Sequence, residues 1–149
     1  MTAGNFHSLN FYSRYYGRME IQRLKITQAE YFIGKVGGFF QPRQKILDVG
    51  CGTGALGSLL VSNYACQVWG LDLSPEAVKL ARENGVEAKL GDIETRWPYP
   101  ANFFDVVVGL QIIEHLVDPD HFLRQVHRVL KPRGLLMLAT PNLAAWFNR

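Results

Sequence analysis

A glycine-rich segment between an apolar run and a helical segment constrains the fold of this chain more than any other feature. The run Lys45–Val49 predicts a buried strand, Gly50-Cys-Gly-Thr-Gly54 follows it directly, and Ala55–Asn63 has the pattern of a helix. In this order, backbone N–H groups and the positive end of a helix meet at one point, where glycines let a ligand approach the main chain. The segment therefore predicts a ligand site at the carboxyl end of this strand.

The chain beyond this segment continues to alternate short apolar runs with helical segments. This alternation predicts an α/β fold built on a doubly wound parallel sheet. Phe104–Leu110 is β-branched and almost wholly apolar, as expected for a strand covered by helices on both faces. One helix should begin with Ser74 as N-cap and Pro75 as first residue. The other expected elements are the end of that helix at Asn84-Gly85, strands at Gln67–Leu71, Glu87–Gly91 and Leu135–Ala139, a helix from Pro119 or Asp120 to Leu130, and a turn at Lys131–Gly134.

The N-terminal part of the chain differs from the rest in charge. Residues 1–45 carry seven Lys and Arg against two Glu, a charge of +5, which leaves −2 for the remainder of a chain with net charge +3. Such a segment can bind RNA, anionic lipid or an acidic substrate, or it can be the solvated face of surface helices. Leu9–Gly34 predicts one or two amphipathic helices, and we expect their aromatic residues to pack over the sheet.

The composition narrows the class of protein further. With 48% hydrophobic and 19% charged residues, the chain should fold as a globular protein. Its two cysteines, Cys51 and Cys66, belong to no CxxC pair or zinc-type cluster, which favours a reduced, cytoplasmic setting. No run of about eighteen apolar residues occurs, so no membrane span is expected.

Two cofactor classes use a glycine loop of this kind. Gly52-Thr-Gly-Ala-Leu-Gly57 satisfies G-x-G-x-x-G, and Asp72 follows about twenty residues later, as in dinucleotide-binding oxidoreductases. The longer run Ile46–Gly54, however, resembles the first signature motif of class I S-adenosylmethionine-dependent methyltransferases. In that motif an acidic residue, here Asp48, precedes the glycines. A carboxylate there would repel a diphosphate but can hold the ammonium of the methionine moiety.

Three further segments resemble the same family, in the same order, between Lys45 and Pro141. The resemblance implies that Asp72 accepts hydrogen bonds from the two ribose hydroxyls and that Leu73 packs on the adenine. It implies adenine contacts for Asp92 and Ile93. Read singly, Asp72 and Asp92 could be turn-forming aspartates. The full set of cofactor-binding residues that the resemblance implies is Asp48, Gly50, Cys51, Gly52, Thr53, Gly54, Asp72, Leu73, Asp92, Ile93, Leu110 and Gln111.

The fourth segment, Phe104–Pro119, bears on the methyl acceptor. It resembles the branch of the family that modifies small molecules and lipids, in which Leu110 and Gln111 would line the methionine end of the cofactor. The Asn/Asp-Pro-Pro-aromatic motif of the base-methylating enzymes does not occur at this point. The resemblance therefore implies a small-molecule or lipid-like acceptor and S-adenosyl-L-homocysteine as the product, and no nucleic-acid substrate is expected.

One cluster of side chains suggests chemistry on the acceptor: Glu114 and His115, with Asp118 and His121 nearby. The stretch resembles ubiquinone-pathway O-methyltransferases, in which a Glu three positions before Glu114 helps to bind a divalent cation. This chain has Gln111 there, so no metal is expected. His115 can serve as a catalytic base for a hydroxyl acceptor. Alternatively, Glu114 and His115 only satisfy loop backbone or face solvent.

The resemblance also implies a Rossmann-like sheet with strand order 3-2-1-4-5. We expect one methyltransferase domain over residues 1–149, with an N-terminal helical segment at 1–40 packed on the sheet and a cofactor-binding core at 45–141. The family normally adds C-terminal strands beyond the fifth, and the sequence shows none. An exposed fifth strand then predicts a truncated chain or a homodimer that covers the edge. A non-catalytic cofactor-binding fragment stays an alternative.

Overall fold

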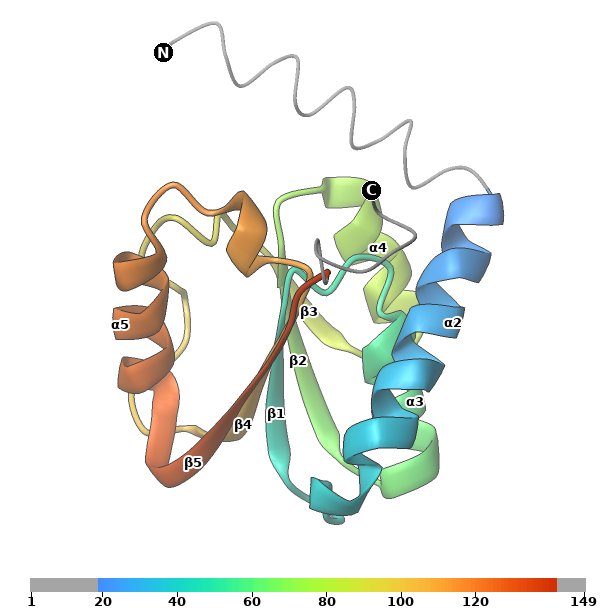
Figure 1. Cartoon of the computed structure of the whole chain (residues 1–149), viewed down its shortest axis with the longest axis horizontal. Helices are drawn as coiled ribbons and strands as arrows, with labels where there is room; N and C mark the ends of the chain where they lie inside the picture. Colours follow the sequence, from blue (N-terminus) through green and yellow to red (C-terminus); the bar gives the residue numbers. More distant parts are fainter. Residues whose placement is uncertain (1–18, 142–149) are drawn as a thin grey trace, which may run out of the picture.

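The predicted parallel sheet with helices on both faces is confirmed. The computed structural model describes residues 19–141 and the side chains of residues 23–141 (Figure 1). Its five strands are all parallel and lie in the order β3-β2-β1-β4-β5. The elements are α2 (Met19–Val36), η1 (Gly37–Phe39), β1 (Lys45–Val49), α3 (Ala55–Tyr64), β2 (Gln67–Asp72), α4 (Pro75–Glu83), β3 (Glu87–Leu90), β4 (Phe104–Leu110), η2 (Ile113–His115), α5 (Pro119–Val129) and β5 (Leu130–Ala139).

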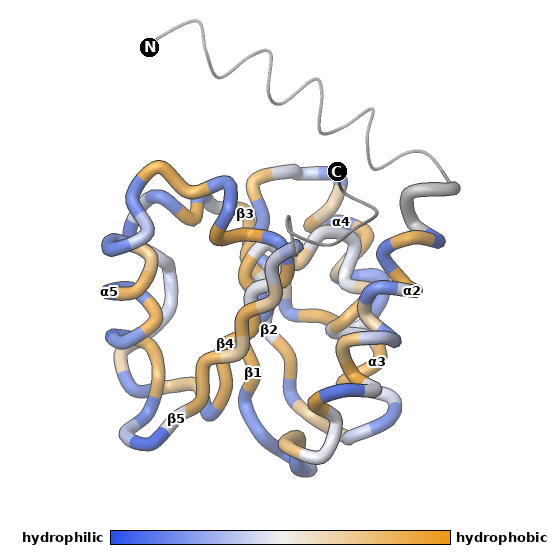
Figure 2. The backbone as a smooth tube through the Cα atoms, viewed as in Figure 1, coloured by the Kyte–Doolittle hydropathy of each residue, from blue (hydrophilic) through white to orange (hydrophobic). Residues whose placement is uncertain are grey.

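Each face of the sheet has its own hydrophobic core. Along β1, Ile46 packs under α2, α3 and α4, whereas Leu47 points to the opposite face, with Phe122 of α5. Both β1 residues are fully buried. The alternation follows from the two-residue period of a strand, and burial of both faces explains why β1 and β4 are so apolar. Figure 2 shows hydrophobic colours along the central strands.

The start of β5 differs from the prediction. Lys131–Gly134 was expected as a turn before a strand at Leu135, but β5 begins at Leu130 and contains these residues as a bulge. Phe104 pairs with Leu130 and Val106 with Leu135, so the register shifts between the two pairs. The Lys131 ammonium lies 2.6 Å from the Asp105 carboxylate of β4. Pairing with the neighbouring strand therefore overrides the local turn signal.

The N-terminal helix packs beside α3, which supports the predicted position of the N-terminal segment. Ala29 and Phe32 of α2 are buried in the core on that face. The expected aromatic packing is wrong for Tyr31, which is 69% exposed and lies under the Lys35 ammonium instead. The small Ala29 and the ring of Phe32 already fill the contact with the core, so Tyr31 faces outward. The predicted helical residues before Met19 lie outside the described part of the chain.

Within residues 19–141, no helix is long and apolar enough to cross a bilayer.

Candidate functional site

The glycine loop turns sharply between β1 and α3. Gly50, Gly52 and Gly54 all have positive φ, of 72°, 53° and 80°, a conformation that side-chain-bearing residues rarely adopt. The N–H groups of Gly50 and Cys51 both donate to the carbonyl of Leu71 in β2. A Cβ on Gly50 would lie 2.2 Å from an Ile112 side-chain carbon. The loop therefore needs glycine both for its backbone and for its close approach to the segment after β4.

A pocket of about 560 Å³ lies beside this loop, in the size range of small-molecule sites. It is found where the carboxyl ends of β1, β2 and β4 meet, the usual site for a ligand in an open α/β sheet. Gly52, Thr53 and Gly54 are not in its wall, although the resemblance included them; they shape the loop instead. The other predicted site residues do line it: Asp48, Gly50, Cys51, Asp72, Leu73, Asp92, Ile93, Leu110, Gln111 and His115.

The Asp72 carboxylate is held by two backbone groups. The Gly52 N–H donates to its Oδ2 at 2.8 Å and the Ser74 N–H to its Oδ1 at 2.9 Å. The first bond joins the glycine loop to the end of β2, and the second joins Asp72 to the N-cap of α4. The side chain is thus fixed in direction although it is nearly buried, at 6% exposed. A carboxylate so held retains lone pairs for further donors on its pocket side.

Asp48 is a buried acid whose pKa departs far from its usual value. It is 3% exposed, and burial together with the nearby Asp72 carboxylate raises the pKa of Asp48 to about 7, against an opposing effect of Lys25. Because a buried charge needs a partner, the sequence alone predicts that Asp48 is satisfied by the N–H groups of the glycine loop, by the cofactor, or by both. Four of the loop N–H groups bond elsewhere. Those of Gly50 and Cys51 donate to the Leu71 carbonyl, that of Gly52 donates to the Asp72 carboxylate, and that of Gly54 donates to the Cys51 carbonyl.

Helix α2 forms one wall of the pocket; the sequence raised the possibility that the N-terminal helices lie over the site, but not which of their residues face it. Leu24, Lys25, Gln28 and Ala29 line it from this helix. Burial lowers the pKa of Lys25, while the charges of Asp72 and Asp48 act in the opposite direction. The i, i+4 spacing of Leu24 and Gln28 indicates a shared helix face. No local pattern, however, tells which part of the sheet that face meets, because the contact joins segments far apart in sequence.

The residues after β4 separate into two groups. Gln111 and His115 line the pocket, whereas Glu114 accepts a hydrogen bond from Thr140 Oγ1 at 3.2 Å, beyond the end of β5. Gln111 has a φ of 54°, and its N–H donates to the Ala139 carbonyl. Asp118 and His121, which the sequence grouped with them, lie at the start of α5, outside the pocket wall. Among the described residues, no three His, Cys, Asp or Glu side chains are grouped as metal ligands.

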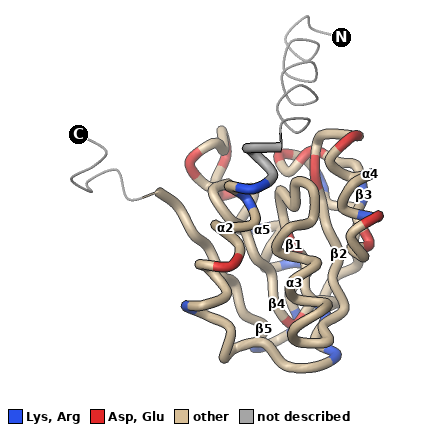
Figure 3. The backbone as a smooth tube through the Cα atoms, turned by 90° about the vertical axis from the view of Figure 1, so that its right-hand side faces the viewer, with Lys and Arg blue, Asp and Glu red and all other residues tan. Residues whose placement is uncertain are grey.

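The pocket is acidic. Its wall contains the four carboxylates of Asp48, Asp72, Asp92 and Glu94 against the single cation Lys25, among the residues that the structure describes. Several acidic positions gather at this end of the sheet in Figure 3, with a basic position of α2 beside them. Clefts lined by charge of one sign concentrate ligands of the opposite sign. The site therefore suits a ligand with a cationic group and disfavours a diphosphate.

An α/β sheet of this order with a glycine loop and acidic strand ends defines a class of cofactor-binding domains, and comparison with known proteins identifies the family. The pattern of the methyltransferase-domain family matches residues 47–138. The chain belongs to this family, within the class I S-adenosylmethionine-dependent methyltransferases.

Individual relatives agree in fold but differ in chemistry. Ubiquinone biosynthesis O-methyltransferase of Xanthomonas oryzae is 38% identical over 104 residues, 66% of this chain and 43% of that protein. Phosphoethanolamine N-methyltransferase 2 of Haemonchus contortus, solved with S-adenosyl-L-methionine, has a TM-score of 0.67 at 27% identity over 75% of this chain and 27% of that one. The [4+2]-cyclase SpnF has a TM-score of 0.67 at 30% identity, over 82% of this chain and 47% of that one. This chain thus spans less than half the length of these proteins.

Proposed function

We propose that this domain binds S-adenosylmethionine in the acidic pocket and transfers its methyl group to a small-molecule or lipid-like acceptor. The observation that carries the proposal is the charge of the wall, four carboxylates against one lysine. The cofactor is cationic at both its sulfonium and its ammonium, whereas NAD and FAD would bring a diphosphate against Asp48, beside the glycine loop. Charge complementarity therefore favours the methyltransferase reading over a dinucleotide oxidoreductase.

The proposal gives a role to seven side chains of the wall. Asp72, already fixed in direction by two N–H groups, accepts from the ribose hydroxyls. Asp92 and Ile93 meet the adenine at one end, with Leu73 on its face. Asp48 holds the ammonium at the other end, directly or through water. Leu110 and Gln111, at the end of β4, lie beside the methionine part.

Methyl transfer demands little chemistry from the protein. The bound cofactor supplies an electrophilic methyl group, and an in-line displacement mainly requires that the acceptor be held against it without intervening water. In this proposal His115, which is exposed in the wall after β4, takes a proton from an acceptor hydroxyl. Glu114, bonded to Thr140, is not part of the proposal.

Calorimetric titration with S-adenosylhomocysteine and with NAD tests the cofactor. We expect binding of the first in the micromolar range and none of the second. Asp72→Ala should weaken S-adenosylhomocysteine by about 1–3 kcal/mol, the range for a buried charged acceptor. The exposed Glu83→Ala in α4 serves as a control and should bind normally. Binding of NAD but not of S-adenosylhomocysteine would reverse the assignment.

The proposed base is tested by His115→Gln, which retains a polar side chain but cannot accept the proton at neutral pH. With labelled S-adenosylmethionine and phenols of the ubiquinone-precursor type as acceptors, turnover should fall by about 10²-fold or more, the usual contribution of a positioned base. Cofactor affinity should stay unchanged. Equal turnover by wild type and variant would remove His115 from the mechanism.

A second candidate function is cofactor binding without methyl transfer. It is favoured by SpnF, which shares the fold at 30% identity and is named a cyclase and not a methyltransferase. Tight S-adenosylhomocysteine binding with no methyl transfer to any acceptor would support it.

A cytoplasmic location also belongs to the proposal, since both cysteines are free and buried among the described residues. Fractionation of cells that produce the tagged protein tests that location.

A further inference from the structure

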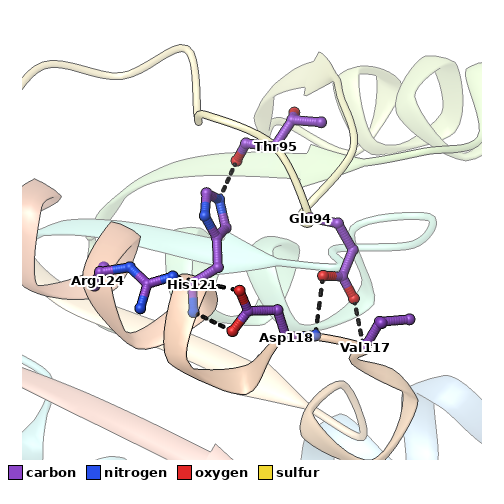
Figure 4. A network of polar contacts seen from close by, with 6 residues as sticks. All are labelled: Glu94, Thr95, Val117, Asp118, His121 and Arg124. Atoms are coloured by element: carbon purple, nitrogen blue, oxygen red, sulfur yellow. Dashed lines mark hydrogen bonds and ion pairs between the residues drawn. The ribbon is translucent and has the colours of Figure 1, made fainter.

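Three polar contacts join the loop after β3 to the start of α5 (Figure 4). Glu94 Oε1 accepts the Val117 N–H at 2.7 Å, and Glu94 Oε2 accepts the Asp118 N–H at 3.4 Å. Thr95 follows Glu94 in the loop, and its carbonyl oxygen lies 3.1 Å from His121 Nε2 of α5. The two segments are more than twenty residues apart in sequence, so these links are tertiary contacts. We refer to them together as the clasp.

Both carboxylate oxygens of Glu94 are engaged by the protein. The residue lies in the pocket wall, yet its acceptors point to backbone N–H groups just ahead of α5. Bonds from N–H groups to a charged acceptor are stronger than bonds between neutral groups. Glu94 therefore holds the backbone just ahead of α5 and is not a free ligand group.

The loop that carries Glu94 is tied internally. Asp92 Oδ1 accepts the Glu94 N–H at 2.8 Å, and the Thr95 hydroxyl donates to the Asp92 carbonyl at 2.9 Å. Further along the same loop, the Trp97 N–H donates to the Gln125 side chain of α5 at 3.3 Å. A shift of Glu94 would thus carry Asp92 with it.

The two segments joined by the clasp supply different parts of the pocket wall. Asp92 and Ile93 stand on one side, and His115 and Leu116, just ahead of Val117, stand on the other. We infer that Glu94 is a positioning residue: by binding the Val117 and Asp118 N–H groups, it sets the distance between the adenine side of the pocket and the acceptor side. This inference rests on the proposed function, because it assumes an adenine beside Asp92.

Substitutions at Glu94 distinguish the effect of side-chain length from the effect of charge. Glu94→Gln keeps the length of the side chain and one carbonyl acceptor for the Val117 N–H. Glu94→Asp keeps the charge but is one methylene too short to reach, and Glu94→Ala loses both. We titrate each variant with adenosine and with S-adenosylhomocysteine by calorimetry. Glu94→Ala and Glu94→Asp should lower the affinity for both ligands about tenfold, whereas Glu94→Gln should keep most of the wild-type affinity.

Asp118→Ala is the matched control. The Asp118 side chain caps α5 by accepting the His121 N–H and pairs with Arg124, but it makes no bond to the loop after β3. This variant should unfold at lower urea concentration yet bind both ligands as the wild type does. Glu94→Gln and Asp118→Ala keep the test informative even if Glu94→Ala does not fold.

The outcomes are distinct. If wild type binds S-adenosylhomocysteine and Glu94→Ala and Glu94→Asp bind it equally well, the inference is wrong and the proposed function stands. Equal loss of affinity in Asp118→Ala and Glu94→Ala would also overturn it, because the cause would then be general loosening of α5. Absence of binding by wild type would reject the proposed function, and the inference with it.

Discussion

Asp48 illustrates, at the scale of a single residue, a conflict between stability and binding. It lies near the end of the apolar strand β1, 3% exposed, with the nearly buried Asp72 nearby. Both its burial and this neighbour disfavour its charged form, which raises its pKa to about 7. A carboxylate that is costly when the pocket is empty has more to gain from a cationic ligand. The residue is therefore better explained by ligand binding than by folding.

The pH dependence of unfolding tests this view of Asp48. Because its pKa is raised in the folded state, the folded chain holds a proton between about pH 4 and 7 that the unfolded chain has released, so stability falls as pH rises through this window. Asp48→Asn removes this effect. Without ligand, the variant should be more stable than wild type at pH 8, by at most about 4 kcal/mol, and the gain should shrink towards pH 4. Urea unfolding at several pH values measures it; a gain independent of pH would contradict the account.

At the scale of elements, the N-terminus of α4 combines a helix cap with support of the site. The Ser74 side chain accepts the Ala77 N–H at 3.2 Å and so caps the helix. Its backbone N–H, in contrast, donates to Asp72. One residue thus performs two tasks with two different groups. The start of this helix was correctly predicted from Ser74 and Pro75, because capping depends on a few adjacent residues.

Substitution of Ser74 separates the two tasks. Ser74→Ala should lower the free energy of unfolding by about 1 kcal/mol, the usual cost of losing an N-cap hydroxyl. Affinity for S-adenosylhomocysteine should not change, since the backbone bond to Asp72 remains. Chemical denaturation and calorimetry of the same sample give both values. A weakened ligand with unchanged stability would show that the hydroxyl serves the site and not the helix.

At the scale of the molecule, β5 is an edge strand of the sheet in the part of the chain that the structure describes. Among the described residues β5 pairs only with β4, and its Leu135 is 40% exposed. An unpaired apolar edge strand is a template for pairing with another chain. The homodimer expected from the sequence would cover this edge, as would additional strands in a longer protein.

Light scattering after size-exclusion chromatography tests whether the edge pairs. The 149-residue chain should self-associate as its concentration rises, and Leu135→Lys should reduce this association because a charge on an edge strand opposes pairing. Val61→Lys is the control, since Val61 is similarly exposed at 36% but lies in α3. A chain that stays monomeric at all concentrations would exclude pairing through β5.

The sequence by itself determined the elements and the residues at the strand ends. The bounds of β1 and β4 were predicted correctly, and the pocket contains Asp48, Asp72 and Asp92. These features depend on patterns within a few residues: apolar runs, glycines, and acids at the point where a strand stops. In parallel strands, such ends meet at one edge of the sheet, so local patterns sufficed to bring the site together.

Only the tertiary structure decided which distant segments meet this site. Lys25 of α2 lies in the same wall as Asp48, and Glu94 joins its loop to Val117. Tyr31 faces outward despite its apolar ring, and Lys131–Gly134 are drawn into β5 by pairing with β4. Each of these depends on contacts between residues that are far apart in the chain. Such contacts are set by the packing of complete elements, and the local sequence carries no signal for them.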